Sequence, residues 1–106
     1  MEEIVFDKRD LHKNICERIH ETYLKKNADY GDSYKIVRDK IPNIIIGHLT
    51  EKLSRLETLL QDGYIPEIED ERIEDTLLDI ANYAIIEIVE RKADWLTSEK
   101  KVSDAI

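Results

Sequence analysis

The sequence predicts an all-α fold, and three observations support this. Apolar residues recur every three or four positions along most of the chain, which is the spacing of one face of a helix. Only three glycines and two prolines interrupt the chain, and they divide it into a few long blocks. No stretch shows the alternation of apolar and polar residues, bounded by turn residues, that is typical of a strand. We therefore expect a small antiparallel bundle of helices.

The first predicted helix covers residues 9–27. Its apolar stripe consists of Leu11, Ile15, Ile19 and Tyr23. Residues 29–33 then gather turn-forming side chains around a glycine, and a left-handed glycine there would end the helix. Residues 34–40 are predicted to form a loop.

The second predicted helix covers residues 43–61. Pro42 is tolerated only near the start of a helix, so the helix begins after it. Its apolar positions are Ile45, Ile46, Leu49, Leu53, Leu56 and Leu60. A turn around Gly63 follows, so the next helix is expected to run antiparallel to this one.

The third predicted helix covers residues 69–95. Its first turns are acidic, as expected at the positive end of a helix dipole. Residues 77–89 are apolar except for Asp79, Asn82 and Glu87, so this part should be central. The sequence thus predicts one domain over residues 1–106, with its core at about 9–95 and a flexible tail at 96–106.

The charge and the single cysteine indicate a compartment and exclude some partners. The formal net charge is −8 and the isoelectric point is near 4.9, which disfavours non-specific binding to nucleic acid or to an anionic membrane. Cys16 cannot form an internal disulfide and is expected to be a core thiol, so a reducing cytoplasm is the predicted location. No apolar run approaches the roughly 20 residues that span a bilayer.

The sequence also predicts self-association. A chain of 106 residues has few other helices with which to cover a segment that is apolar nearly all round. We therefore expect a homo-oligomer, either a dimer or a tetramer.

Three polar residues share one stripe of the third predicted helix. Asp75, Asp79 and Asn82 lie at positions i, i+4 and i+7, and they cannot all reach solvent if other helices pack on them. Burying an unpaired carboxylate costs several kcal/mol, which is comparable to the whole stability of a small domain. These carboxylates must therefore be neutralised.

Two neutralising arrangements remain open, and both use the second predicted helix. Its residues 48, 51, 52 and 55 fall on one continuous face. In a structural interpretation, Lys52 and Arg55 pair with the two aspartates. These ion pairs favour one arrangement of the helices, and the residues take part in no reaction. In a functional interpretation, Glu51 joins the aspartates to hold Mg²⁺, and the two basic residues bind the phosphates of a nucleotide.

The chain resembles a known family at these positions. The resemblance rests on residues 25–33, Arg38, the Glu-Lys-Leu-Ser-Arg-Leu segment at 51–56 and residues 74–85. Together they are similar to the nucleotide modification associated domain family, known mainly from phages and bacteria. That family looks like an offshoot of the MazG-like all-α nucleoside triphosphate pyrophosphohydrolases. It implies a helical, nucleotide-handling, often oligomeric protein.

The resemblance also implies roles for particular residues. Mg²⁺, or Mn²⁺ in its place, would be held by Glu51, Asp75 and Asp79, with Glu51 and Asp79 as the catalytic pair. The nucleotide-binding residues would be Asp29, Tyr30, Asp32, Arg38, Lys52, Arg55 and Asn82. MazG-like enzymes place two glutamates three residues apart and a Glu-x-x-Asp on the next helix, whereas this chain has His48 and Thr76 at two of these positions.

Three functions are therefore expected, in order. The first is a Mg²⁺-dependent pyrophosphohydrolase acting on a (deoxy)nucleoside triphosphate. The second is a non-catalytic protein that sequesters or senses a modified or signalling nucleotide, and the incomplete set of metal ligands favours it. The third is a structural helical oligomer.

Overall fold

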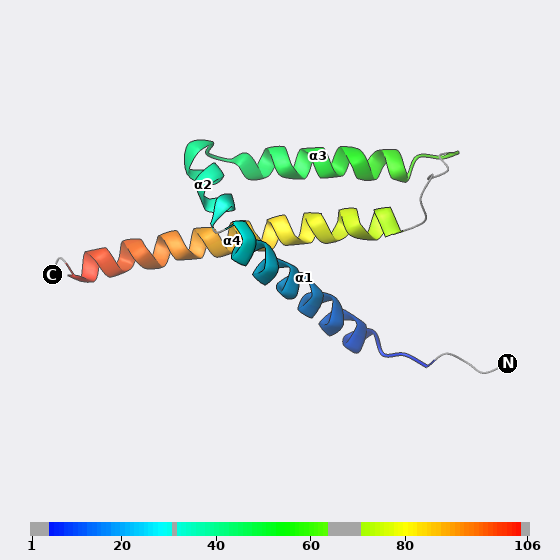
Figure 1. Ribbon diagram of the computed structural model, residues 1–106, viewed down its shortest axis with the longest axis horizontal. Helices are drawn as coiled ribbons and strands as arrows, with labels where there is room; N and C mark the ends of the chain where they lie inside the picture. Colours follow the sequence, from blue (N-terminus) through cyan, green and yellow to red (C-terminus); the bar gives the residue numbers. More distant parts are fainter. Residues whose placement is uncertain (1–4, 31, 64–70, 105–106) are drawn as a thin grey trace. The chain divides into compact units, whose positions relative to one another are not determined.

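The computed structural model describes residues 5–30, 32–63 and 71–104, with side chains described for 5–27, 32–63 and 72–98. All regular secondary structure in this part of the chain is helical, which confirms the all-α prediction. The elements are α1 (Lys8–Tyr30), α2 (Ser33–Lys40), α3 (Ile44–Leu59) and α4 (Glu71–Asp104) (Figure 1). The chain divides into two units, Met1–Ser33 and Tyr34–Ile106, and each is described by itself.

Helix α1 forms the first unit, and Asp7 caps its N-terminus. The backbone N–H of Arg9 donates to Asp7 Oδ1 at 2.8 Å, and the N–H of Leu11 donates to the carbonyl oxygen of Asp7 at 3.1 Å. The bond to Asp7 Oδ1 satisfies the N–H of Arg9, which has no partner inside the helix, and the bond from Leu11 is the first regular bond of the helix. Hydrogen bonds from Arg9 also hold the pKa of the Asp7 carboxyl below its usual value.

Two sequence predictions for this unit need correction. The helix ends at Tyr30, three residues beyond the predicted end at 27, so residues 29 and 30 are helical. Cys16 is exposed, and the prediction of a core thiol is wrong. The physical reason is that the described part of this unit contains no second helix to cover the thiol.

Residues 33–40 form helix α2, so the predicted loop at 34–40 is wrong. The helix is short, and two of its side chains, one turn apart, hold it to α4. Tyr34 donates a hydrogen bond to Glu87 at 2.9 Å, and Arg38 donates to the same carboxylate at 3.1 Å. Within α2, Lys35 and Asp39, one turn apart, form an exposed ion pair 2.7 Å long.

A tight turn joins α2 to α3. Asn43 has φ 65° and ψ 23°, a left-handed conformation that asparagine tolerates better than most residues. The N–H of Ile44 donates to the carbonyl oxygen of Ile41 at 3.2 Å, which closes a four-residue turn around Pro42. Proline followed by a residue with positive φ is the arrangement of a type II turn. Helix α3 begins directly after it, close to the predicted start at 43.

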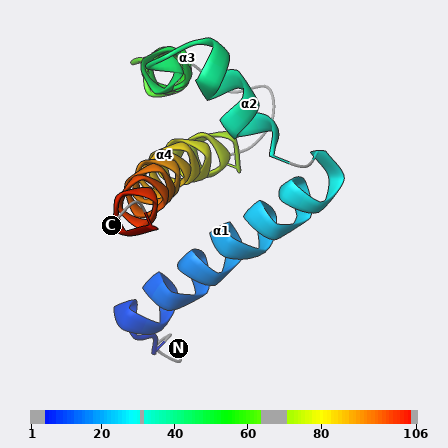
Figure 2. The same cartoon turned by 90° about the vertical axis from the view of Figure 1, so that its left-hand side faces the viewer.

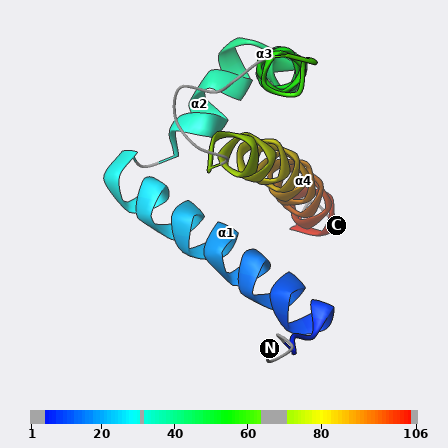
Figure 3. The same ribbon diagram turned by 90° about the vertical axis from the view of Figure 1, so that its right-hand side faces the viewer.

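Helices α3 and α4 lie side by side and run antiparallel (Figure 1). Figures 2 and 3 look along this pair from its two ends, and in both views α3 remains next to α4. His48 stacks on Tyr83, and Lys52, four residues later on α3, contacts Asp79, four residues earlier on α4. This register is that of two antiparallel helices. The prediction that the second and third long helices face one another is confirmed by these contacts.

Helix α4 is longer than the sequence predicts. It continues to Asp104, so residues 96–104 are helical where a tail was expected. Thr76, which is 2% exposed, lies in its buried face, and its hydroxyl donates to the carbonyl oxygen of Arg72 at 2.7 Å. In the described residues, no helix is both long enough and apolar enough to cross a membrane.

One flank of α3 is apolar and exposed, which bears on the expected oligomer. Ile46 and Leu53 of α3 and Leu60, directly after its last residue, recur every seven residues and are 65, 49 and 60% exposed. A seven-residue apolar repeat is typical of a helix that pairs with another helix. We expect a second copy of the chain to cover this flank.

Sedimentation velocity at tens of micromolar tests this expectation. Leu53→Lys should shift the protein from a dimer or tetramer towards the monomer, because a charge would be buried between copies. Thr50→Lys, at an exposed polar position of the same helix, is the matched control. A wild-type protein that sediments as a monomer contradicts the prediction.

Candidate functional site

The predicted acidic and basic stripes meet at an ion pair. The ammonium nitrogen of Lys52 on α3 lies 3.2 Å from Asp79 Oδ2 on α4. The two side chains are 21% and 42% exposed, so the pair is at the edge of the helix interface and water reaches it. This contact brings together two residues that the sequence assigned to one site, and it is also the pairing expected in the structural interpretation.

Helical spacing places further predicted residues beside this pair. Glu51 and Arg55 belong to the same face of α3 as Lys52, and Asp75 lies one turn before Asp79 on α4. All three side chains are exposed. We call this surface the polar side of the α3–α4 pair, defined by Glu51, Lys52, Arg55, Asp75, Asp79 and Asn82.

The carboxylates of the polar side do not form a closed metal site. Among the residues whose side chains are described, no group of three or more His, Cys, Asp and Glu is arranged to hold a metal ion. Mg²⁺ that arrives with a nucleotide needs fewer protein ligands, because waters and phosphates complete its coordination. Asp75 and Asp79, one turn apart, have the oxygen ligands that this ion prefers.

Three aromatic rings form a cluster next to the polar side. The rings of His48 and Tyr83 are almost parallel, at 8°, with centroids 4.3 Å apart. Tyr34 of α2 is the third, with its centroid 6.0 Å from that of His48 and 6.4 Å from that of Tyr83. The cluster joins α2, α3 and α4. None of its members was predicted as a site residue, although His48 shares a face of α3 with Lys52.

Asn82 has a buried acceptor that is not satisfied. Its side-chain oxygen Oδ1 is buried and has no hydrogen-bond partner in the described part of the chain. Buried polar groups are nearly always hydrogen-bonded, and leaving one unpaired costs about 1–3 kcal/mol. The residue lies between Asp79 and Tyr83 on α4, at a position that the sequence assigned to nucleotide binding.

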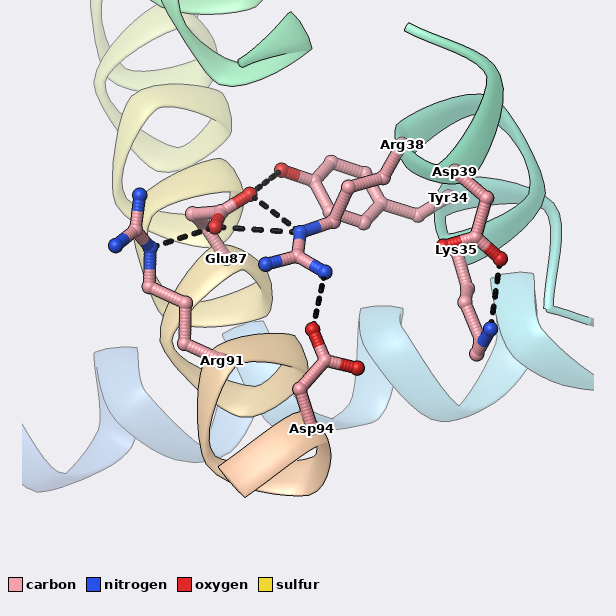
Figure 4. Close-up of polar contacts among 7 residues, drawn as sticks. All are labelled: Tyr34, Lys35, Arg38, Asp39, Glu87, Arg91 and Asp94. Carbon is pink, nitrogen blue, oxygen red and sulfur yellow. Dashed lines mark hydrogen bonds and ion pairs between the residues drawn. The ribbon is translucent and has the colours of Figure 1, made fainter. Parts of the chain in front are cut away.

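Arg38, also predicted to bind the nucleotide, takes part in a different cluster (Figure 4). Its Nε donates to Glu87 Oε1 at 3.1 Å, and its guanidinium forms an ion pair with Asp94 at 2.7 Å. Tyr34 and Arg91 donate to the same glutamate at 2.9 and 2.8 Å. We call Glu87, its three donors and the Asp94 partner of Arg38 the Glu87 network.

Burial and hydrogen bonds act in opposite directions on this glutamate. Glu87 is 8% exposed, and loss of water around it raises the pKa of its carboxyl. Hydrogen bonds from Arg38, Tyr34 and Arg91 lower the pKa by more, so the net shift is downward. Burial, together with the hydrogen bond to Glu87, raises the pKa of the Tyr34 hydroxyl. Glu87 is therefore held as a charged carboxylate.

The Glu87 network is separate from the Lys52–Asp79 pair. Glu87 and Asp79 lie eight residues apart on α4, which corresponds to about 12 Å along the helix axis. The structure therefore places Arg38 and Lys52 against different parts of α4. Glu87 had a signal in the sequence, since it is one of three polar residues in the apolar segment at 77–89.

The remaining predicted residues lie in the first unit. Asp29 and Tyr30 are in the last turn of α1, and their side chains are outside the described residues. Asp32 is exposed between α1 and α2. Their predicted contacts with a base or a ribose stay predictions.

Comparison with known proteins identifies the family. The family model described as nucleotide modification associated domain 1 matches residues 26–90, which is more than half of the chain. The match includes α2, α3 and the part of α4 that carries the polar side. No curated protein and no solved structure matches the chain. The chain belongs to the nucleotide modification associated domain 1 family.

Proposed function

We propose that this protein binds a (deoxy)nucleoside triphosphate on the polar side of the α3–α4 pair. The contact between Lys52 and Asp79 supports this proposal most directly, because it brings the basic stripe of α3 against the acidic stripe of α4. The family match supports a role in nucleotide handling. The two lines of support are independent.

The charges of the polar side suit a nucleotide that carries a divalent cation. Lys52 and Arg55 would bind phosphate oxygens by charge-assisted hydrogen bonds. Asp79, only 3.2 Å from Lys52, would repel a bare triphosphate. A bound Mg²⁺ removes this repulsion, since it attracts both the carboxylates and the phosphates. Binding should therefore be stronger with Mg²⁺ or Mn²⁺ than without.

A second candidate function is hydrolysis of the triphosphate to the monophosphate and pyrophosphate. Glu51, Asp75 and Asp79, on the two facing helices, support it. A Mg²⁺ ion bound there would supply charge stabilisation for phosphoryl oxygens. Lys52 and Arg55 would orient the phosphates. This candidate function includes the proposal that the chain is related to the MazG-like enzymes. The third possibility, a helical oligomer without a ligand, is an outcome of the test below.

The test combines binding with turnover. Wild-type protein is titrated with each common (deoxy)nucleoside triphosphate by calorimetry, with EDTA, Mg²⁺ or Mn²⁺, and the products are followed by chromatography. We expect affinity to increase at least about tenfold when Mg²⁺ replaces EDTA. Release of pyrophosphate supports the hydrolase, and binding without products supports the binding protein.

Asp79→Asn is the variant that tests the role of the cation. It keeps the size of the side chain but removes the charge that repels phosphate. We expect this variant to bind without metal better than the wild type does, and to lose most of the Mg²⁺ effect. If neither protein binds any triphosphate in any condition, the proposed function is wrong and a structural role remains.

A further inference from the structure

The buried oxygen of Asn82 indicates a missing hydrogen-bond donor. This oxygen can only accept hydrogen bonds, and the described part of the protein offers it no donor. A buried acceptor of this kind becomes favourable when a ligand supplies the donor. The group that completes this position should therefore carry an N–H or O–H.

The aromatic rings one residue further along α4 indicate what kind of group that donor belongs to. Tyr83 follows Asn82 directly, and its ring is stacked on His48 with centroids 4.3 Å apart. A third ring cannot enter between them, because stacked rings are already at contact distance. A flat ligand can only extend the stack from outside. A nucleobase with an exocyclic amine combines a flat ring with the donor that Asn82 lacks.

We propose that Asn82 Oδ1 accepts a hydrogen bond from the exocyclic amino group of the bound base. The protein would thus select amino-bearing bases, such as cytosine and adenine, against analogues with a carbonyl at that position. With uracil or hypoxanthine, a carbonyl oxygen would face the Asn82 oxygen, and two acceptors would be buried together. This inference rests on the proposed function, since it specifies the base of the same nucleotide.

Two matched pairs of nucleotides test the selection. The pair dCTP and dUTP, and the pair dATP and dITP, each differ in whether an amino group or a carbonyl stands at one ring position. Calorimetric affinities are measured for all four with Mg²⁺ at fixed salt. We expect the amino-bearing member of at least one pair to bind about tenfold tighter or more.

Two substitutions show whether Asn82 is responsible. Asn82→Leu removes the amide and keeps the branched skeleton of the side chain, and it should reduce the affinity ratio within the pair to about one. It is expected to fold, because an unsatisfied buried group is replaced by an apolar one. Asn82→Asp keeps an acceptor and should keep the preference for the amino-bearing member, even where overall affinity decreases.

The outcomes separate this inference from the proposed function. If the wild type binds both members of each pair equally, the selection by Asn82 is wrong while nucleotide binding stands. A preference that persists in Asn82→Leu also overturns the role of Asn82. If no nucleotide binds, the proposed function fails and this inference fails with it.

Discussion

Replacing Glu87 with alanine is expected to lower the free energy of unfolding by about 3–5 kcal/mol, because it removes the buried carboxylate that accepts hydrogen bonds from Tyr34, Arg38 and Arg91. Arg38, whose side chain is 18% exposed, keeps only its ion pair with the half-exposed Asp94, and the Tyr34 hydroxyl loses its acceptor. Both residues belong to α2, so this helix should be held to α4 more weakly. Urea unfolding followed by circular dichroism measures the change.

Arg91→Ala provides the matched control. Arg91 donates to the same carboxylate at 2.8 Å, but its side chain is 64% exposed. An exposed ion pair contributes little, so this variant should lose less than about 1 kcal/mol. Equal losses of unfolding free energy for Glu87→Ala and Arg91→Ala would show that burial of Glu87 does not determine how much it contributes to stability.

The Glu87 network also predicts how the stability of the protein depends on pH. The pKa of Glu87 is lower in the folded protein than its ordinary value of 4.5, so the folded state favours the charged carboxylate. The resulting stabilisation is complete above about pH 4.5 and is lost as the pH falls through the lower, folded pKa. The stability difference between wild type and Glu87→Gln should therefore shrink below pH 4.5. A difference that stays constant down to pH 3 contradicts this.

The long helices could be predicted from the sequence because the pattern that indicates a helix lies within the helix itself. The period of apolar residues in α3 and α4 can be read from any short window, and their stripes meet as the antiparallel arrangement requires. The pairing of Lys52 with Asp79 follows from those stripes, so one contact of the site was within reach of sequence reasoning.

Helix α2 and the position of Arg38 could not be predicted in this way. The helix has only eight residues, too few to be stable alone, and the hydrogen bonds that hold it cross 49 and 53 positions of the sequence. The sequence marked Arg38 through a family resemblance, and the structure adds the carboxylates of Glu87 and Asp94 as its partners. The stacked rings were missed for the same reason, since their three members come from three helices.

Alanine at Arg55 or at Lys52 is expected to reduce triphosphate affinity by about ten- to a hundredfold, the equivalent of about 1.5–3 kcal/mol for a charge-assisted hydrogen bond. The effect on stability should be much smaller. Arg55 is exposed, and the ion pair of Lys52 with Asp79 is open to water, so each variant should lose less than about 1 kcal/mol of unfolding free energy. Calorimetry at fixed salt and urea unfolding measure the two quantities on the same samples.

Lys92→Ala is the control for a general charge effect. Lys92 is exposed on α4, about 20 Å along the helix from Asp79, so it shares the net charge of the protein but not the polar side. Its removal should leave triphosphate affinity within about twofold of the wild type. If all three variants bind alike, or if their losses of affinity follow their losses of stability, Lys52 and Arg55 do not bind phosphate. The Lys52–Asp79 pair is then only a contact between the two helices. A surface that binds phosphate must lose more affinity when one of its own cations is removed than when a distant cation is removed.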